Sequence, residues 1–220
     1  MYRRMHVARA LILAIACAPL LTARGRAQSG RAADTTASPA KGASTARVTI
    51  VEFADFHCPA CAHFVRETLP RLDAEYISTG LVRYVLIDFP IASLHPRAMK
   101  AALAAHCAGE QGRFWEMHDV LFANQGGAGR DSLAAHARAI GIDADALVAC
   151  VKSKRYAAMV REGLNVGRRA GVRGTPTFFI TVGEPGKAGL RAVRMIYGSE
   201  PYDTFKRALD EVLVGSDQNP

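Results

Sequence analysis

A pair of cysteines three residues apart, Cys58 and Cys61, constrains the fold of this chain more than any other feature. The pair follows residues 48–53, a run that is apolar and β-branched enough to form a buried strand. After the pair, Phe64 and Leu72 belong to a set of apolar residues that recurs at helical spacing. We therefore expect Cys58 near the N-terminus of a helix that begins where a buried strand has ended.

This position of the pair favours redox chemistry. Unpaired backbone N–H groups give a helix N-terminus partial positive charge, which lowers the pKa of Cys58 and favours its thiolate. Cys61 lies about one turn further along, where its sulfur can attack a mixed disulfide on Cys58 and release the partner. Pro59 suits the first helical turn because it has no N–H group to leave unpaired. The spacing predicts a redox-active disulfide formed by Cys58 and Cys61.

The same spacing has other interpretations, because two cysteines so placed also supply half of a zinc site. His57 and His63 flank the pair and could serve as ligands. A structural zinc site usually adds a second close pair of ligands, whereas Cys107 and Cys150 stand alone in the sequence. We favour a redox pair and predict no metal site, with zinc binding and a purely structural disulfide as the alternatives.

The N-terminus has the pattern of an export signal. Residues 1–27 combine a basic start, an apolar stretch at residues 10–21, and small residues at the positions that a signal peptidase reads. The apolar stretch is shorter than the roughly 20 residues that a spanning helix needs. We expect cleavage of this signal and a periplasmic or otherwise extracytoplasmic location, with lipid attachment at Cys17 as a less favoured alternative. Residues 28–46 are rich in small and polar residues and predict a flexible linker.

Net charge excludes a nucleic-acid partner once the N-terminus is set aside. The whole chain carries +8, but seven of its 28 basic residues and only one of its 20 acidic residues precede Arg47. The rest holds 21 basic and 19 acidic residues, a net charge of +2. A balance this close to neutral is not the footprint of nucleic-acid binding.

The remaining chain is long enough for one domain, residues 47–215, followed by a short tail at 216–220. Residues 81–89 predict a second strand, and the pattern between about 96 and 170 is helical throughout. Later segments predict a hairpin and a closing helix, at residues 177–182, 190–197 and 201–214. The order of elements predicts an α/β fold with a long helical insertion.

That order resembles the thioredoxin fold with an inserted helical subdomain, and in particular the DsbA-like thiol:disulfide oxidoreductases. The resemblance rests on three segments: residues 52–61 around the cysteine pair, 114–122 in the insertion, and 171–180 before and within the third strand. With the connecting elements, it covers nearly all of residues 47–214. It is far more specific than the cysteine spacing by itself.

The resemblance assigns substrate binding to Thr175 and Pro176. In that family the proline before the third strand is cis and faces the redox pair. A cis bond at Pro176 would expose the backbone of Thr175, which could hydrogen-bond an extended substrate peptide beside Cys58. The alternative is a trans proline that merely starts a strand.

Glu52 is a carboxyl in an otherwise apolar strand, six residues before Cys58. Burial would raise its pKa. The resemblance then implies that Glu52 accepts the proton of Cys61 when Cys61 attacks the mixed disulfide, which is general-base catalysis. An exposed strand residue is the alternative. Asp55 competes for this role, but its closeness to the loop favours exposure.

Removal of the export signal leaves four cysteines, an even number that suits an oxidising compartment. Cys107 and Cys150 fall in separate expected helices. We favour a structural disulfide between them, which would restrict the unfolded chain by roughly 4 kcal/mol in the entropic model. Two buried free thiols are the alternative.

The resemblance implies an enzyme that introduces disulfide bonds into secreted or periplasmic proteins through Cys58 and Cys61. A strongly oxidising member of the family carries histidine between its cysteines; the alanine at position 60 predicts an oxidant of intermediate strength. The expected partners are reduced or unfolded exported proteins and a quinone-linked membrane reoxidase. We expect a monomer without a cofactor. A disulfide isomerase or reductase and a non-enzymatic peptide-binding chaperone are the alternatives.

Overall fold

The computed structural model describes residues 38–126, 128–183 and 190–217. The predicted export signal, Cys17, most of the predicted linker and the last three residues of the predicted tail lie outside the described residues. The described elements are β1 (Ala40–Lys41), β2 (Val48–Ala54), α1 (Pro59–Glu67), α2 (Leu69–Leu72), the π-helical turn η1 (Asp73–Ile77), β3 (Val82–Asp88), α3 (Ala98–Gly109), α4 (Phe114–Ala123), α5 (Arg130–Ala139), α6 (Ala144–Ser153), α7 (Ala157–Arg169), β4 (Thr177–Val182), β5 (Arg191–Tyr197) and α8 (Tyr202–Asp217).

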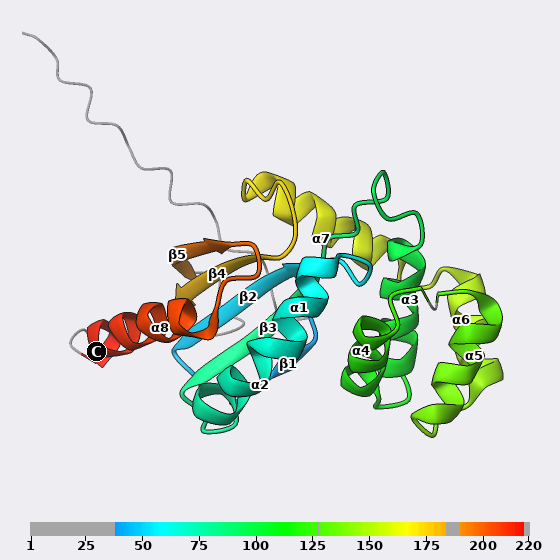
Figure 1. The fold of residues 1–220 in the computed structure, drawn as a ribbon, viewed down its shortest axis with the longest axis horizontal. Coiled ribbons are helices and arrows are strands. Elements are labelled where there is room, and N and C mark those ends of the chain that lie inside the picture. Colours follow the sequence, from blue (N-terminus) through cyan, green and yellow to red (C-terminus); the bar gives the residue numbers. More distant parts are fainter. Residues whose placement is uncertain (1–37, 127, 184–189, 218–220) are drawn as a thin grey trace, which may run out of the picture.

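The strands of the described part form one mixed sheet in the order β1-β3-β2-β4-β5 (Figure 1). The neighbours β2 and β3 run parallel, whereas β1 and β4 pair antiparallel with β3 and β2, and β5 with β4. A parallel pair needs a crossover, and α1, α2 and η1 supply it. Every residue of the central strand β2 is buried, which explains its nearly continuous apolar and β-branched composition. The predicted hairpin is present as β4 and β5.

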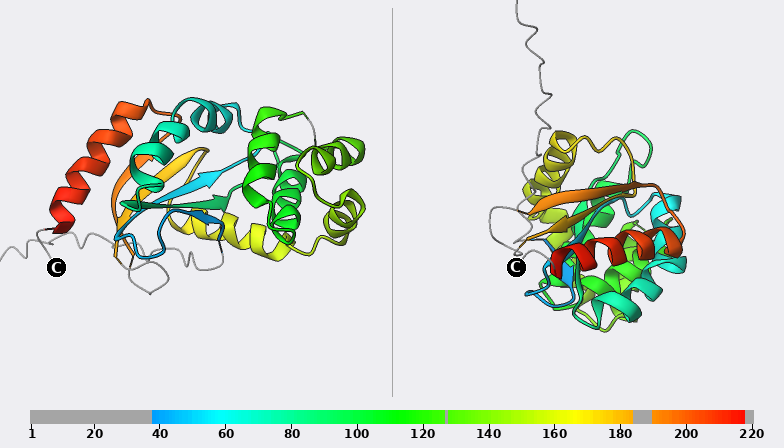
Figure 2. Two further views of the ribbon diagram at one scale, coloured as in Figure 1. Left: turned by 90° about the horizontal axis from the view of Figure 1, so that it is seen from below. Right: turned by 90° about the vertical axis from the view of Figure 1, so that its left-hand side faces the viewer.

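Helices cover both faces of the sheet (Figure 2). On one face, Ile50 of β2 lies in an apolar cluster with Phe64 of α1 and Phe205 of α8. On the opposite face, Phe53 of β2 lies in a cluster against which Leu164 of α7 packs. Successive strand residues point to opposite faces, so the position of a residue in β2 decides which layer it meets.

Two glycines allow α7 to lie against the end of β3. A Cβ atom on Gly163 would lie 2.6 Å from the backbone oxygen of Asp88, and one on Gly167 would lie 2.6 Å from the ring of Phe89. A larger residue at either position would force the helix away from the sheet. The predicted insertion of residues 96–170 therefore has two parts. Helices α3 to α6 pack mainly on one another, whereas α7 packs against the sheet.

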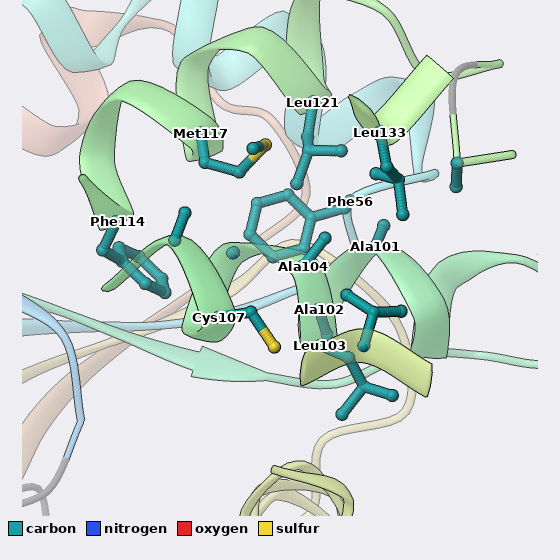
Figure 3. Close-up of a cluster of buried hydrophobic side chains, with 14 of the residues drawn as sticks. Phe56, Ala101, Ala102, Leu103, Ala104, Cys107, Phe114, Met117, Leu121 and Leu133 are labelled. Carbon is teal, nitrogen blue, oxygen red and sulfur yellow. The ribbon is translucent and has the colours of Figure 1, made fainter. Parts of the chain in front are cut away.

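Phe56 anchors the loop before the cysteine pair in the helical insertion. Figure 3 shows its ring between Met117 and Leu121 of α4 on one side and Ala101 and Ala104 of α3 on the other. Small side chains along α3 leave space for a whole aromatic ring. The start of the loop is therefore held by core packing.

The predicted α/β fold of the thioredoxin type with a helical insertion is confirmed, with a correction at each end of the domain. Residues 40–41, expected within a flexible linker, instead form β1, and the Leu86 N–H donates to the Pro39 carbonyl oxygen at 3.0 Å. This pairing covers an edge of β3 that would otherwise present free backbone groups. A strand of two residues is too short to show alternation, so its sequence does not reveal it.

At the other end, α8 continues to Asp217, past the predicted start of the tail at residue 216. The closing helix was expected at residues 201–214, whereas α8 continues through Gly215. A glycine near a helix end need not terminate the helix, because its cost within a helix is only about 1 kcal/mol. The apolar face of α8 that contacts the sheet lies earlier, at Phe205 and Leu209.

Candidate functional site

The cysteine pair lies at the N-terminus of α1. Cys58 is the N-cap residue and Pro59 lies in the first turn. Both thiols are reduced in this structure. Cys61 is fully buried, whereas Cys58 keeps 7% of its surface exposed. Cys58 is therefore the more exposed residue of the pair.

Several hydrogen-bond donors converge on Cys58 and lower its pKa to about 5. The largest cause is the hydrogen bond from the Cys61 thiol, and burial opposes it. The backbone N–H groups of Cys61 and Ala60 lower the pKa further. Those N–H groups are the unpaired donors of the helix N-terminus. At neutral pH Cys58 is a thiolate, which makes it both a nucleophile and a good leaving group.

Cys61 has the opposite electrostatic environment. Burial is the largest cause that raises its pKa well above the ordinary value, followed by its hydrogen bond to Cys58 and the negative charge of Glu52. Cys61 therefore keeps its proton at neutral pH. Its attack on a mixed disulfide requires a group that accepts this proton.

Glu52 is a fully buried carboxyl on β2, two residues along from Ile50 and therefore on the face that α1 covers. Burial raises its pKa to about 8, and a hydrogen bond from the Tyr84 hydroxyl to Oε2 partly offsets that effect. Its other oxygen, Oε1, has no hydrogen-bond partner among the described residues. A carboxyl that titrates near neutral pH within electrostatic reach of Cys61 has the properties of a proton acceptor.

Thr175 and Pro176 lie against the redox pair. The peptide bond between them is cis. The Cys58 sulfur lies 3.2 Å from the Thr175 carbonyl oxygen, to which its thiol form donates. The hydroxyl of Thr177 donates to the Gly174 carbonyl oxygen at 2.7 Å and holds the loop from the other side. The structure thus places all five predicted residues of the redox site, Glu52, Cys58, Cys61, Thr175 and Pro176, in one region.

Asp55 is buried, contrary to the expected exposure. Its carboxylate accepts hydrogen bonds of 2.8 Å from the backbone N–H groups of His57 and Ile91 and lies 2.8 Å from the His95 ring nitrogen Nδ1. The expectation was wrong because a second loop, which carries Ile91 and His95, covers this part of the chain. An aspartate two residues before a loop N–H is a common turn pattern, so the local bond to His57 had a sequence signal.

Gln125 is a further residue that sequence reasoning missed. Its side-chain amide donates to the carbonyl oxygens of Cys58 at 2.7 Å and Phe56 at 3.2 Å. It follows α4, 67 residues after Cys58. No local pattern marks such a contact, since it depends on how the insertion folds back over the active-site loop.

Cys107 and Cys150 form a disulfide that joins α3 to α6, with an S–S distance of 2.06 Å. This bridge belongs to the helical insertion and is separate from the redox pair. His63, considered as a metal ligand, instead lies with Nδ1 2.8 Å from the Ser199 hydroxyl. Within the described residues, no three His, Cys, Asp or Glu side chains converge as a metal site requires.

Comparison with known proteins places this geometry in a family. Residues 34–185 match the family model described as thioredoxin. The structure superposes on BdbD from Bacillus subtilis with a TM-score of 0.71 and 23% identity, covering 84% of this chain and 97% of that one. The chain is 38% identical over 84 residues to the probable disulfide bond formation protein D of Bacillus cereus, which is 38% of this chain and 39% of that protein.

Another relative is a much longer protein. The chain is 39% identical over 143 residues to the Na(+)/H(+) antiporter NhaA 3 of Salinispora tropica, which is 64% of this chain and 21% of the antiporter. The chain thus spans about a fifth of the length of this relative. None of the helices described in the present structure is both long enough and apolar enough to cross a bilayer.

Proposed function

Because this chain belongs to the thioredoxin family and has the fold of the DsbA-like proteins, we propose that it is a thiol:disulfide oxidoreductase that introduces disulfide bonds into exported proteins. One observation carries the proposal: the two sulfurs of the pair are electrostatically unequal. Cys58 is accessible and has a pKa of about 5, whereas Cys61 is buried and protonated. Such a pair exchanges with partners at one sulfur and resolves with the other.

The reaction starts from the oxidised pair. A substrate thiolate attacks the Cys58 sulfur, a mixed disulfide forms, and the bond between Cys58 and Cys61 breaks. The electron pair of that bond leaves with the Cys61 sulfur. Glu52, protonated in much of the population at neutral pH because its pKa is about 8, supplies a proton to the Cys61 thiolate.

A second substrate thiolate then attacks the substrate sulfur of the mixed disulfide. A disulfide forms in the substrate, and Cys58 leaves as a thiolate, which its low pKa makes favourable. The substrate has lost two electrons and the enzyme pair has gained them. In the reverse direction, the Cys61 thiol attacks the mixed disulfide, and Glu52 accepts its proton.

The low pKa of Cys58 also favours the oxidising direction. A stabilised thiolate stabilises the reduced pair, and a reduced pair that is stable makes the disulfide a stronger oxidant. Lowering a thiol pKa from 9.0 to about 5 favours the reduced form about a hundredfold at pH 7. That factor corresponds to roughly 60 mV in a two-electron couple. This supports the oxidase over the isomerase or reductase and fits an oxidant of intermediate strength.

The location and partners are part of the proposal. The predicted export signal supports a periplasmic or otherwise extracytoplasmic site of action, where disulfides persist. Reduced exported proteins are the substrates, held as extended chains at Thr175. A quinone-linked membrane partner restores the disulfide after each turnover, and the enzyme acts as a monomer.

Oxidation of a reduced peptide tests the reaction. Wild-type protein should oxidise a two-cysteine peptide stoichiometrically, and Cys58→Ala should abolish this activity, because the accessible sulfur is lost. Cys61→Ala, incubated with the symmetric disulfide of a one-cysteine peptide, should trap the mixed disulfide, because the Cys58 thiolate attacks that disulfide, one peptide leaves as a thiolate, and no Cys61 thiol resolves the product; mass spectrometry detects it. A double variant, Cys107→Ala with Cys150→Ala, is the control and should keep the redox activity.

Thiol trapping in cells tests the direction. A pair that is mostly oxidised supports a disulfide donor, whereas a pair held mostly reduced would replace the proposal by an isomerase or reductase. Unchanged peptide oxidation in Cys58→Ala would rule out the enzyme altogether and leave the peptide-binding chaperone.

A further inference from the structure

A cavity of about 750 Å³ opens between α3, α6 and α7, in the helical insertion. Its volume is in the range of sites for small organic molecules. The residues that line it come from elements other than those of the redox site, and neither cysteine of the redox pair is among them. The cavity is therefore a second candidate site.

The floor of the cavity is apolar. Met99 and Leu103 of α3 line it together with Val148 and Val151 of α6 and Leu133 of α5. Leu103 and Leu133 are also part of the buried core of the insertion. In Figure 3, Leu103 points away from Phe56, so it presents its side chain on another side of α3 from the one that packs against the active-site loop. The cavity is thus lined in part by side chains that belong to the hydrophobic core of the insertion.

Four cations surround this floor: Lys100, Lys152, Lys154 and Arg161. Within the described part of the chain, none of the four has an ion-pair partner, and none of the lining residues is acidic. Two other arginines nearby are paired: Arg155 with Glu110 at 2.6 Å, and Arg169 of α7 with Glu162 at 2.7 Å.

One of these four cations, Lys154, has an unusual backbone conformation. We call the four cations around the apolar floor the rim of the cavity. Lys154 ends α6 in the left-handed conformation, with φ 56°, which glycine or asparagine usually occupies. Lys154 thus places a long cationic side chain where the backbone conformation is unfavourable for a residue other than glycine or asparagine.

We propose that the cavity binds a single-chain anionic amphiphile, with the acyl chain on the apolar floor and a carboxylate among the four cations. A small inorganic anion would leave the apolar floor in contact with water, and a neutral hydrocarbon would leave the cations unpaired. A fatty-acid-like molecule satisfies both, since burial of its methylene groups and the attraction of its carboxylate act together. The site goes beyond the proposed redox function and does not depend on it.

Titration with dodecanoate, below its micelle concentration and followed by calorimetry on the full chain, tests the proposal. Saturable binding of one dodecanoate per chain is expected. A double variant, Lys152→Gln with Lys154→Gln, should weaken binding at least tenfold, because two exposed cations of the rim are lost while the core is untouched. Val148→Asp should abolish binding by placing a carboxylate on the floor.

A matched control is Arg207→Gln on α8, an exposed cation at the opposite end of the molecule from α6 (Figure 1). This control should bind dodecanoate as the wild type does. Circular dichroism of each variant checks that the fold is retained.

Three results would overturn the proposal: no saturable binding by wild-type protein, equal binding of dodecanol, or unchanged affinity in the lysine double variant. Acetate should not compete, and competition by acetate would reduce the site to an anion site without an apolar part. Peptide oxidation by Lys152→Gln with Lys154→Gln should be normal. Failure of dodecanoate binding therefore leaves the redox proposal intact, and loss of redox activity in Cys58→Ala should leave dodecanoate binding intact.

Discussion

At the scale of single residues, the chemistry of the site depends on a difference in pKa between its two thiols, which lie in different environments. Cys58 has the backbone donors of a helix N-terminus, whereas Cys61 and Glu52 are fully buried, and burial is the largest cause that raises the pKa of each. Burying a carboxyl costs free energy, which the Tyr84 hydroxyl offsets only in part. Glu52 therefore serves the reaction but lowers the stability of the folded protein.

Glu52→Gln should stabilise the reduced protein at high pH. The pKa of Glu52 is 4.5 unfolded and about 8 folded, so the folded state binds more protons between these values and wild-type stability falls as pH rises through them. Removing the titration should raise the free energy of unfolding by on the order of 3 kcal/mol at pH 8 and by less than about 1 kcal/mol at pH 5. Urea unfolding at the two pH values measures this. An equal effect at both would show that the carboxyl pKa is not raised.

Tyr84→Phe should change the pH dependence of the resolving step. Without the Tyr84 hydroxyl, the Glu52 carboxylate loses its hydrogen bond, and its pKa rises further. The pH at which Cys61 attack becomes half-maximal should rise by about one unit, as expected for one hydrogen bond to a charged group. Stopped-flow release of the second thiolate from an aromatic disulfide follows this step. Glu52→Gln is the reference and should remove this titration, and a profile unchanged by Tyr84→Phe would contradict the assignment.

At the scale of elements, the positions of the helices depend on small residues, glycine and alanine, as much as on large apolar ones. α7 reaches the sheet through Gly163 and Gly167, and α3 accommodates Phe56 through its alanines. Such contacts set the distance between layers because packed interiors contain few voids that could absorb an added methyl group.

Gly163→Ala should destabilise the protein, although alanine is the better helix former. A Cβ there would lie 2.6 Å from the backbone oxygen of Asp88, which cannot move without distorting β3. We expect the free energy of unfolding to fall by about 1–3 kcal/mol, despite a gain of ~1 kcal/mol in helix propensity. Denaturant titration measures the change. Gly215→Ala on α8, where a Cβ meets nothing within 4 Å, is the matched control and should be neutral or stabilising.

At the scale of the whole molecule, the helical insertion is attached to the sheet by more than apolar packing. His106 of α3 and Asp88 of β3 form a buried pair with 2.6 Å between Nε2 and Oδ2, which connects the two regions. The disulfide between Cys107 and Cys150 then ties α3 to α6. An ion pair thus connects the insertion to β3, and a disulfide connects α3 to α6 within the insertion.

Removing that disulfide should lower stability without removing redox activity. In a background with Cys58→Ala and Cys61→Ala, replacing Cys107 and Cys150 by alanine should reduce the free energy of unfolding by up to about 4 kcal/mol, since the unfolded chain is no longer cross-linked. Denaturant titration of the two proteins gives the difference. Alkylation of the wild type without reductant should label neither Cys107 nor Cys150, and labelling of both would contradict the bridge.

Local sequence patterns were enough to predict most of the elements, though not β1, and the reactive pair. The apolar run of β2, the helical periodicity after the cysteines and the turn-rich break before β5 are all features of neighbouring residues, and each led to the element observed. The position of Cys58 at a helix N-terminus also follows from local order, because a strand must end before a helix can begin. The backbone part of its lowered pKa was therefore predictable.

Tertiary structure alone decided what surrounds that pair. The burial of Asp55, the contact of Gln125 with the active-site loop, the bond from Tyr84 to Glu52 and the strand β1 all join segments far apart along the chain. Hydrogen bonding and burial act over a few ångströms in space, regardless of separation in sequence. For that reason the sequence by itself determined which residues could do the chemistry, and only the folded chain determined which of their protons are held and which are released.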